Sequence, residues 1–559
     1  MLGKTHHVAI ERNVPATMRD GTILRADIYR PDDGGKYPTL LSRTPYNKDT
    51  TEEPSRRLAE RGYCVVEQDV RGRYASDGDI TPGFFSGEHF DAEDGYDSVE
   101  WAAALAWSTG KVGTIGGSYV GWTQWELAHT RPPHLAAMMP QAIAANLLDR
   151  EMSAVLRLGR VLWWSVNTLA PDQRVRDDAP WGPRTQDEAE RLWTEQDRSK
   201  WLWYLPLAEI PDYAMYGIGK HWRRWLADHA SDHFGFLERH SSIEVPALIT
   251  TGWYDQQIGA IKNFTGMRAN GATADARDGT RLIVGPWTHV SYDWESVVGE
   301  MDFGPEATVD FYDTSDAWFG RWLKGSVSRA EEQTPIRLFV MGANSWRSET
   351  EWPPAGTVFE DYFLQADGGL SRQPPVDASP DEYDYDPRDP VMTLYSPGGQ
   401  QEPHDLRALD GRHDVLTYTT APLESPLEVV GPITVKLWAA SSAPDTDFIV
   451  RLVDVWPDGF AQELCYGIVR ARYRDGFAAP TPIEPGRPYE YTIVVNPTAN
   501  LFKSGHRIRI DVTSSDFPNF DRNHNTGGDD YHEAVLATAR QTISHDGGRP
   551  SRVVLPVQR

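Results

Sequence analysis

The order of apolar and polar positions divides the chain into three kinds of sequence. Up to about residue 144, and again over 242–334, apolar runs of strand length are separated by turns and helical stretches, which predicts an α/β domain in two parts. Over 145–241, charged residues and tryptophans recur at helical spacing, which predicts an inserted helical cap. Over 335–559, short alternating strands with Pro, Gly and Asp between them predict a β-sandwich.

One apolar strand leads directly into a serine with glycines on both sides. The stretch Lys111–Gly121 is a short apolar strand that runs into Ser118 and then into a predicted helix that includes Trp122–Ala128. A strand that turns at once into a helix around one serine is the layout of a nucleophile elbow. The usual pattern is G-x-S-x-G, whereas here the second glycine comes one residue late, at Gly121. Ser118 is the candidate nucleophile, and the alternative is an ordinary serine in a Gly-rich turn.

An acid and a histidine follow this serine at the ends of two further apolar runs. The run 245–254 ends at Asp255, and the run 281–288 ends at His289. In α/β-hydrolases the nucleophile, the acid and the histidine follow in this order, and catalytic groups of open α/β sheets lie beyond the carboxyl ends of strands. Taken singly, such an aspartate or histidine is more often a packing or surface residue. Their order and placement together predict a triad with Ser118.

Five stretches carry a resemblance to a known family. They are Pro45-Tyr46, Gly116-x-Ser118-Tyr119-x-Gly121, Gly252-Trp253-Tyr254-Asp255, Gly285-Pro286-Trp287-x-His289 and Ser515–Asn523. The set resembles the cocaine-esterase family of serine hydrolases, which is related to Xaa-Pro dipeptidyl-peptidases and α-amino-acid ester hydrolases. The resemblance implies a jelly-roll-like C-terminal domain, a cap that shapes the acyl pocket, and an oxyanion-hole role for the Tyr46 hydroxyl.

The residues and the resemblance together predict an acyl-enzyme mechanism without metal or cofactor. Ser118 attacks, His289 moves the proton, Asp255 orients the histidine, and the Tyr46 hydroxyl and the Tyr119 backbone N–H bind the oxyanion. Because ligand pockets are lined by apolar and aromatic side chains, Trp164 of the cap is the candidate substrate contact.

An ester with an aryl or bulky hydrophobic acyl group is the first choice of substrate. α-Amino-acid ester hydrolases hold the substrate ammonium with carboxylates close behind the catalytic acid, whereas Gln256 and Gln257 follow Asp255 here. A Xaa-Pro dipeptidyl-peptidase or an amide acylase is the alternative within the superfamily. A binding protein with an inactive hydrolase domain is the alternative outside it, and the complete set of triad residues argues against it.

Charge and cysteine content narrow the partners and the compartment. The formal net charge of −26 disfavours nucleic acid, which needs clustered Lys and Arg. Neither a signal-peptide core nor an apolar run of membrane-spanning length is present in the sequence. Cys64 and Cys465 lie in apolar strand-like runs, which favours the reducing cytoplasm and makes Cys64 a poor nucleophile. We expect a small-molecule ester as partner, no membrane, and, as the resemblance permits, a homodimer.

Overall fold

The structure is a computed structural model of the chain. It describes residues 6–80, 89–146, 155–228, 235–255, 258–289, 293–326, 334–376, 378–395 and 401–559. Gln256 and Gln257, on which the comparison with amino-acid ester hydrolases depends, lie outside the described residues. Among the helices that are described, none combines the length and apolar character needed to cross a bilayer.

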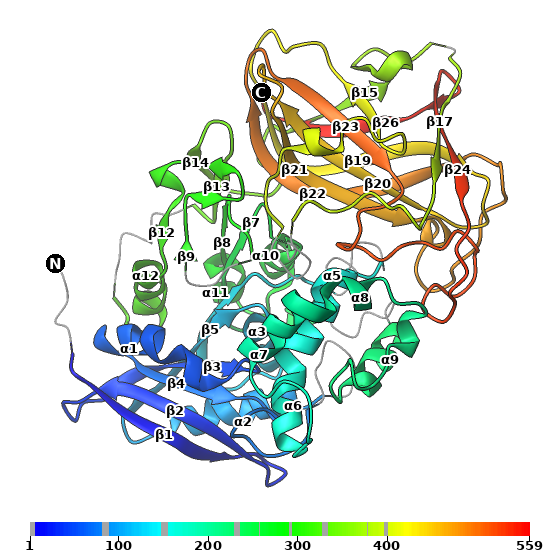
Figure 1. Cartoon of the computed structure of the whole chain (residues 1–559). Helices are drawn as coiled ribbons and strands as arrows, with labels where there is room; N and C mark the ends of the chain where they lie inside the picture. The colour runs from blue at the N-terminus through cyan, green and yellow to red at the C-terminus, as the bar shows by residue number, and fades with distance from the viewer. Residues whose placement is uncertain are drawn as a thin grey trace.

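The N-terminal half is built on a ten-stranded sheet (Figure 1). In spatial order its strands are β1 (Val8–Thr17), β2 (Ile23–Pro31), β4 (Cys64–Asp69), β3 (Tyr37–Thr44), β5 (Ser108–Gly117), β6 (Leu135–Gln141), β7 (Leu248–Gly252), β8 (Arg281–Gly285), β13 (Ile336–Val340) and β14 (Ser345–Glu349). The strands from β4 to β13 are parallel, and β1, β2 and β14 are antiparallel to their neighbours. This is the predicted open α/β sheet.

Helices cover both faces of this sheet, which explains the continuously apolar strands. Alternate side chains of a strand point to opposite faces. The helices are α1 (Glu52–Glu60), α2 (Asp91–Ala103), α3 (Tyr119–Ala128), α10 (Ala260–Asn270), α11 (Ala274–Gly279) and α12 (Phe311–Lys324). Leu40 and Val65 pack in the layer that contains α1 and α12, whereas Leu41 and Val66 pack in the layer of α2, α3 and α10.

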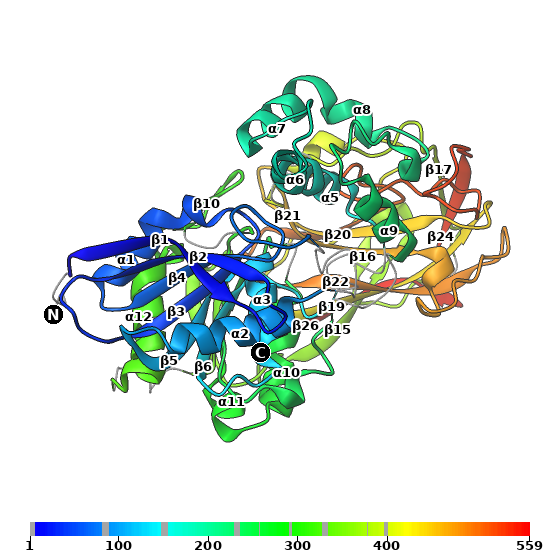
Figure 2. The ribbon, with the colours of Figure 1, turned by 90° about the horizontal axis from the view of Figure 1, so that it is seen from below.

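The helical cap lies between β6 and β7 in the chain and beside the C-terminal strands in space (Figure 2). Its helices are α5 (Leu158–Trp164), the π-helical turn η2 (Ser165–Leu169), α6 (Ala170–Arg176), α7 (Gln186–Leu192), α8 (Arg198–Leu202) and α9 (Gly219–Asp228). Trp201, Trp222 and Trp225 are buried in a core formed mostly by cap residues, which Phe517 and Tyr531 of the C-terminal domain join. Most of the tryptophan-rich pattern therefore reflects packing inside the cap.

The C-terminal domain is an antiparallel β-structure, as predicted. Its strands are β15 (Val358–Leu364), β16 (Leu370–Ser371), β17 (Asp381–Tyr385), β18 (Leu416–Thr419), β19 (Leu427–Ser441), β20 (Asp447–Val455), β21 (Ala461–Arg470), β22 (Tyr489–Phe502), β23 (Arg507–Thr513), β24 (Ala539–Asp546), β25 (Arg549–Pro550) and β26 (Arg552–Val557). The loop between β23 and β24 lies against the cap, where Gly159 N–H donates to the Pro518 carbonyl at 2.7 Å and Ala208 N–H to the Tyr531 carbonyl at 2.9 Å.

One strand lies in a different sheet from the one predicted. Ile336–Val340 was assigned to the sandwich, but as β13 it pairs in parallel with β8 of the first sheet. The chain leaves β8, forms α12 and returns beside β8, which is the usual βαβ crossover. Local alternation cannot reveal which sheet a strand joins, so the first sheet extends to Glu349, past the predicted boundary at 334.

Candidate active site

Ser118 occupies the tight turn between β5 and α3. Its backbone has φ 57° and ψ −126°, a conformation that costs a non-glycine residue energy and is typical of a nucleophile elbow. A Cβ at Gly116 would come 2.3 Å from Val120 Cγ1, and one at Gly121 would come 2.9 Å from the Gln141 carbonyl oxygen. The glycine comes one residue late in the motif because position 121, not 120, lies against the neighbouring strand.

His289 and Asp255 contact each other, and His289 lines the same cavity as Ser118. Asp255 is fully buried after β7, and its Oδ1 lies 2.9 Å from His289 Nδ1. The Thr251 hydroxyl donates to Asp255 Oδ2 at 3.1 Å and so fixes the second carboxylate oxygen. This arrangement favours a proton on Nδ1 and leaves Nε2 as the acceptor nitrogen.

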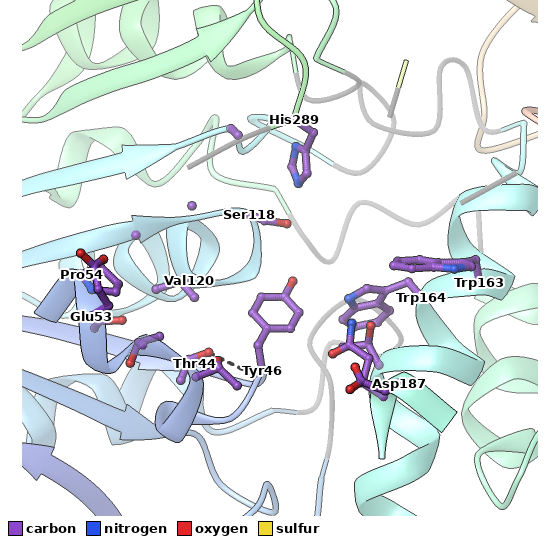
Figure 3. Close-up of a pocket in the computed structure, with 18 of the residues that line it drawn as sticks. Thr44, Tyr46, Glu53, Pro54, Ser118, Val120, Trp163, Trp164, Asp187 and His289 are labelled. Carbon is purple, nitrogen blue, oxygen red and sulfur yellow. Dashed lines mark hydrogen bonds between the residues drawn. The ribbon is translucent and has the colours of Figure 1, made fainter. Parts of the chain in front are cut away.

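A cavity of about 760 Å³ brings four of the predicted site residues together. Ser118, His289, Tyr46 and Trp164 all line it. In Figure 3 the His289 ring, the Ser118 hydroxyl and the Tyr46 hydroxyl point into the same space, and the indoles of Trp163 and Trp164 lie opposite them. Trp163 has the same helical spacing that singled out Trp164, and sequence reasoning did not choose it.

The loop that carries Tyr46 is held from both sides. The Tyr46 N–H donates to Thr44 Oγ1 at 3.0 Å. Behind it, the buried Arg73 donates from Nε to the Pro45 carbonyl at 2.9 Å and from its Nη atoms to the carbonyls of Leu169 and Thr168 at 2.9 and 2.8 Å. Nothing in the sequence around Arg73 indicated this contact, because its partners come from another loop and from the cap.

Tyr119 is the first residue of α3, and its side chain and backbone face different surroundings. The phenol is buried and donates to Asp91 Oδ2 at 3.1 Å, while the ring stacks on Trp164 with 6.4 Å between centroids. The first N–H groups of a helix point away from it and favour negative charge. The start of α3 beside Ser118 is therefore suited to an anionic oxygen.

Charged side chains also line this cavity. Arg57, Arg160, Glu53 and Asp187 line the same cavity as the two indoles. The Arg57 guanidinium lies over the Tyr312 ring at 3.8 Å and 3.6 Å from Glu53. Sequence reasoning missed all four, since isolated surface charges carry no motif.

Cys64 is separate from this chemistry. Both cysteines are buried and free, and burial raises the pKa of Cys64 to about 12. At neutral pH the thiol is therefore protonated and a poor nucleophile.

Comparison with known proteins places the chain in a family. Its residues 20–291 match the X-Pro dipeptidyl-peptidase (S15 family), and residues 328–554 match the X-Pro dipeptidyl-peptidase C-terminal non-catalytic domain. A cocaine esterase of Rhodococcus sp. is 36% identical, with 98% of each chain covered. The chain belongs to the cocaine-esterase family of serine hydrolases. A putative serine esterase of Mycobacterium bovis is 27% identical over 90% of each chain.

Solved structures agree with this family assignment. An α-amino acid ester hydrolase matches with a TM-score of 0.85 and 26% identity, covering 99% of this chain and 97% of the other. An aminopeptidase from a marine sediment archaeon, Thaumarchaeota archaeon, matches with a TM-score of 0.83 and 25% identity over the same shares. The predicted α/β-hydrolase fold is confirmed, and this member of the cocaine-esterase family is a serine-type carboxylic ester hydrolase.

Proposed function

We propose that the chain hydrolyses carboxylic esters with aryl or bulky hydrophobic acyl groups, with Ser118 as nucleophile. One observation carries the proposal: Ser118 shares an aromatic-walled cavity with His289, whose Nδ1 lies 2.9 Å from the fully buried Asp255. A hydroxyl beside an imidazole that is itself oriented by a carboxylate is the arrangement that activates a weak nucleophile.

The reaction begins when His289 Nε2 accepts the Ser118 proton and Oγ attacks the ester carbonyl. Asp255 holds the imidazole in the required tautomer and stabilises its protonated form. The Tyr46 hydroxyl and the Tyr119 N–H stabilise the oxyanion, after which His289 protonates the leaving alcohol. Water then repeats the sequence on the acyl-enzyme and releases the acid.

The wall of the cavity supports a neutral, aromatic acyl group. Trp163 and Trp164 offer flat apolar surfaces, which suit an aryl ring. The carboxylates of Glu53 and Asp187 also line the cavity, so an amino-acyl substrate is the second candidate. We rank the amino-acyl substrate below the aryl ester because Glu53 is already paired with Arg57 at 3.6 Å. Both Glu53 and Arg57 are exposed, so water would also screen the attraction between Glu53 and a substrate ammonium.

We also propose that the enzyme works in the cytoplasm. The free, buried thiols of Cys64 and Cys465 support a reducing compartment, where unpaired cysteines persist.

The test is burst kinetics with p-nitrophenyl benzoate and a series of p-nitrophenyl esters of different acyl length. We expect the wild type to turn over the benzoate fastest and Ser118→Ala to lose on the order of 10⁶-fold in kcat. An aminoacyl-proline p-nitroanilide and an amino-acyl ester are the competing substrates. Preference for either would move the assignment to peptidase or amino-acyl esterase. If Ser118→Ala keeps its activity, or a fluorophosphonate fails to label the wild type, the proposed mechanism is wrong.

A further inference from the structure

Three side chains with metal-binding atoms meet in the loop between β23 and β24, outside the catalytic cavity. Within the described residues, His524, Asp530 and Glu533 each offer one ligand atom, and these atoms lie within 4.8 Å of one another. No motif in the sequence marked them, because the spacing matches none of the common zinc or calcium patterns.

His524 supplies the observation that distinguishes this cluster from an ordinary acidic loop. Its side chain is 2% exposed, and Nδ1 is buried without a hydrogen-bond partner. The same Nδ1 lies 3.8 Å from Glu533 Oε1, too far for a hydrogen bond but a suitable separation for two ligands of one ion. A buried imidazole nitrogen without a partner is costly unless something binds it.

From this geometry we propose that His524, Asp530 and Glu533 bind one divalent transition-metal ion, with Zn²⁺ as the first candidate. One imidazole nitrogen and two carboxylate oxygens are a donor set that suits Zn²⁺ or Mn²⁺ better than Ca²⁺, which prefers six or more oxygens. Three protein ligands leave at least one position for water. Drawing the ligands to about 2.1 Å from a common ion requires side-chain shifts of about 1 Å or less.

The loop already holds two of these ligands in place. A Cβ at Gly528 would come 2.7 Å from Glu533 Oε2, so the glycine leaves the carboxylate room in its present position. The Thr526 hydroxyl donates to Glu533 Oε1. On the other side, the Ala537 N–H donates to the His524 carbonyl at 3.0 Å. The site is therefore organised before an ion binds, which lowers the cost of binding.

The surrounding charges favour a cation. Asp530 Oδ2 lies 3.1 Å from Arg470 Nη1 and 3.3 Å from Arg472 Nη2, so one carboxylate oxygen faces two guanidiniums. These guanidiniums are shared with three further buried carboxylates, those of Asp445, Asp447 and Asp521. The Arg522 guanidinium also acts on His524, so with Glu533 included three positive groups face five carboxylates. A divalent ion would offset much of this buried negative charge.

A bound ion would fasten the loop that contacts the cap. Tyr531 lies between two of the ligands, and its carbonyl accepts from Ala208 N–H of the cap. The ion stands outside the ester chemistry, for which we expect no metal, and its role is to stabilise the junction of the sandwich and the cap.

The test measures Zn²⁺ binding by untagged protein that has been stripped with EDTA. Isothermal titration and metal analysis after dialysis should show one tightly bound Zn²⁺ per chain. We expect His524→Asn and Glu533→Gln each to weaken Zn²⁺ at least about 100-fold, since each loses one ligand of three. His532→Asn is the matched control, because His532 belongs to the same loop but lies exposed, 3.0 Å from Asp529.

Three results would overturn the proposal. The first is that the wild type binds neither Zn²⁺ nor Mn²⁺. The second is that Glu533→Gln binds Zn²⁺ as tightly as the wild type. The third is that only His532→Asn loses binding, which would mean that the ion binds at the surface histidine His532. Glu533 is partly exposed, so Glu533→Gln remains a fair test if His524→Asn fails to fold. Anomalous scattering at the zinc edge from a Zn²⁺-soaked crystal must place the ion between the three side chains.

Discussion

The two sides of the candidate active site are held by different domains and by different kinds of contact. On the oxyanion side, the Arg73 guanidinium is fully buried and joins the Pro45 carbonyl to two carbonyls at the end of η2 in the cap. A π-helical turn is where the helical hydrogen-bond pattern changes, so its carbonyls can accept from outside donors. The positively charged guanidinium of Arg73 thereby holds the Tyr46 loop against the cap.

On the acid side, a neutral hydroxyl makes the link. Tyr254 precedes Asp255 in the chain, and its hydroxyl donates to the Glu463 carbonyl of β21 at 3.2 Å and accepts from Gln462 Nε2 at 3.1 Å. The acid loop is therefore fixed to the sandwich. Hydrogen bonds from a charged group are stronger than neutral ones. Breaking the contacts of Arg73 should therefore lower kcat more than breaking the contacts of Tyr254. The cap thus holds the loop that carries Tyr46, and the C-terminal domain holds the loop that carries Asp255.

Removing the acid itself should have the largest effect of these changes. In Asp255→Asn the amide cannot stabilise a protonated His289 and favours the wrong tautomer, so kcat should fall by about 10⁴-fold. The measurement is kcat for p-nitrophenyl benzoate. Thr251→Val removes only the hydroxyl that supports Asp255 and should cost far less. A loss below tenfold in Asp255→Asn would remove this residue from the mechanism.

The oxyanion donor should rank second. Tyr46→Phe removes one hydroxyl and should lower kcat by about 10²–10³-fold with little change in KM. Tyr119→Phe is the matched control, because it removes a phenol bound to Asp91 but keeps the backbone N–H beside Ser118. Equal losses in the two variants would contradict the roles we assign to them.

Replacing Arg73, which holds the Tyr46 loop against the cap, should lower kcat less than replacing Tyr46 itself. Arg73→Lys keeps the positive charge but cannot reproduce the hydrogen bonds of the planar guanidinium to the three backbone carbonyls. We expect kcat to fall about tenfold. If Arg73 acts through Tyr46, the same substitution in the Tyr46→Phe background should add little. Full additivity in this double-mutant cycle would show that Arg73 supports the fold generally.

Replacing Tyr254, which holds the Asp255 loop against the C-terminal domain, should lower kcat less than replacing Arg73. Tyr254→Phe removes about 1 kcal/mol of hydrogen bonding, so we expect a loss of about two- to fivefold in kcat. The loss should disappear in the Asp255→Asn background. If Tyr254→Phe lowers kcat more than Arg73→Lys does, the ranking of the two sides is reversed.

The smallest effect on activity is expected for Glu67, which lies on β4 next to the strand that leads to Tyr46. Burial raises the pKa of this carboxyl from 4.5 to about 7, and its Oε1 accepts from the Ser55 hydroxyl at 2.9 Å. Between pH 4.5 and 7 the unfolded chain loses the proton while the folded protein keeps it. The free energy of unfolding should therefore fall as pH rises through this range and level off above pH 7.

Glu67→Gln should remove this pH dependence without changing kcat. At pH 8 the variant should be more stable than the wild type by up to about 3 kcal/mol, and at pH 4 the two should be alike. Thermal unfolding between pH 4 and pH 8 measures the difference in Tm. Parallel Tm profiles for the two proteins would show that Glu67 ionises freely in the folded state.

The sequence by itself was enough to predict the α/β sheet, the cap, the β-domain and the positions of Ser118, Asp255 and His289. These features are local: a glycine-flanked serine after a strand, and strands that end in an acid or a histidine, can be recognised within about ten residues. The same is true of Trp164, which stands in a helical pattern.

Only the tertiary structure decided which distant groups meet. The addition of β13 to the first sheet, the contact between Arg73 and the cap, the link from Tyr254 to β21 and the charge balance around His524 all join segments far apart in the chain. A strand or a buried arginine has the same local pattern wherever its partner lies. The partner is chosen by chain topology and by the need to satisfy buried polar groups, which act between segments rather than along them.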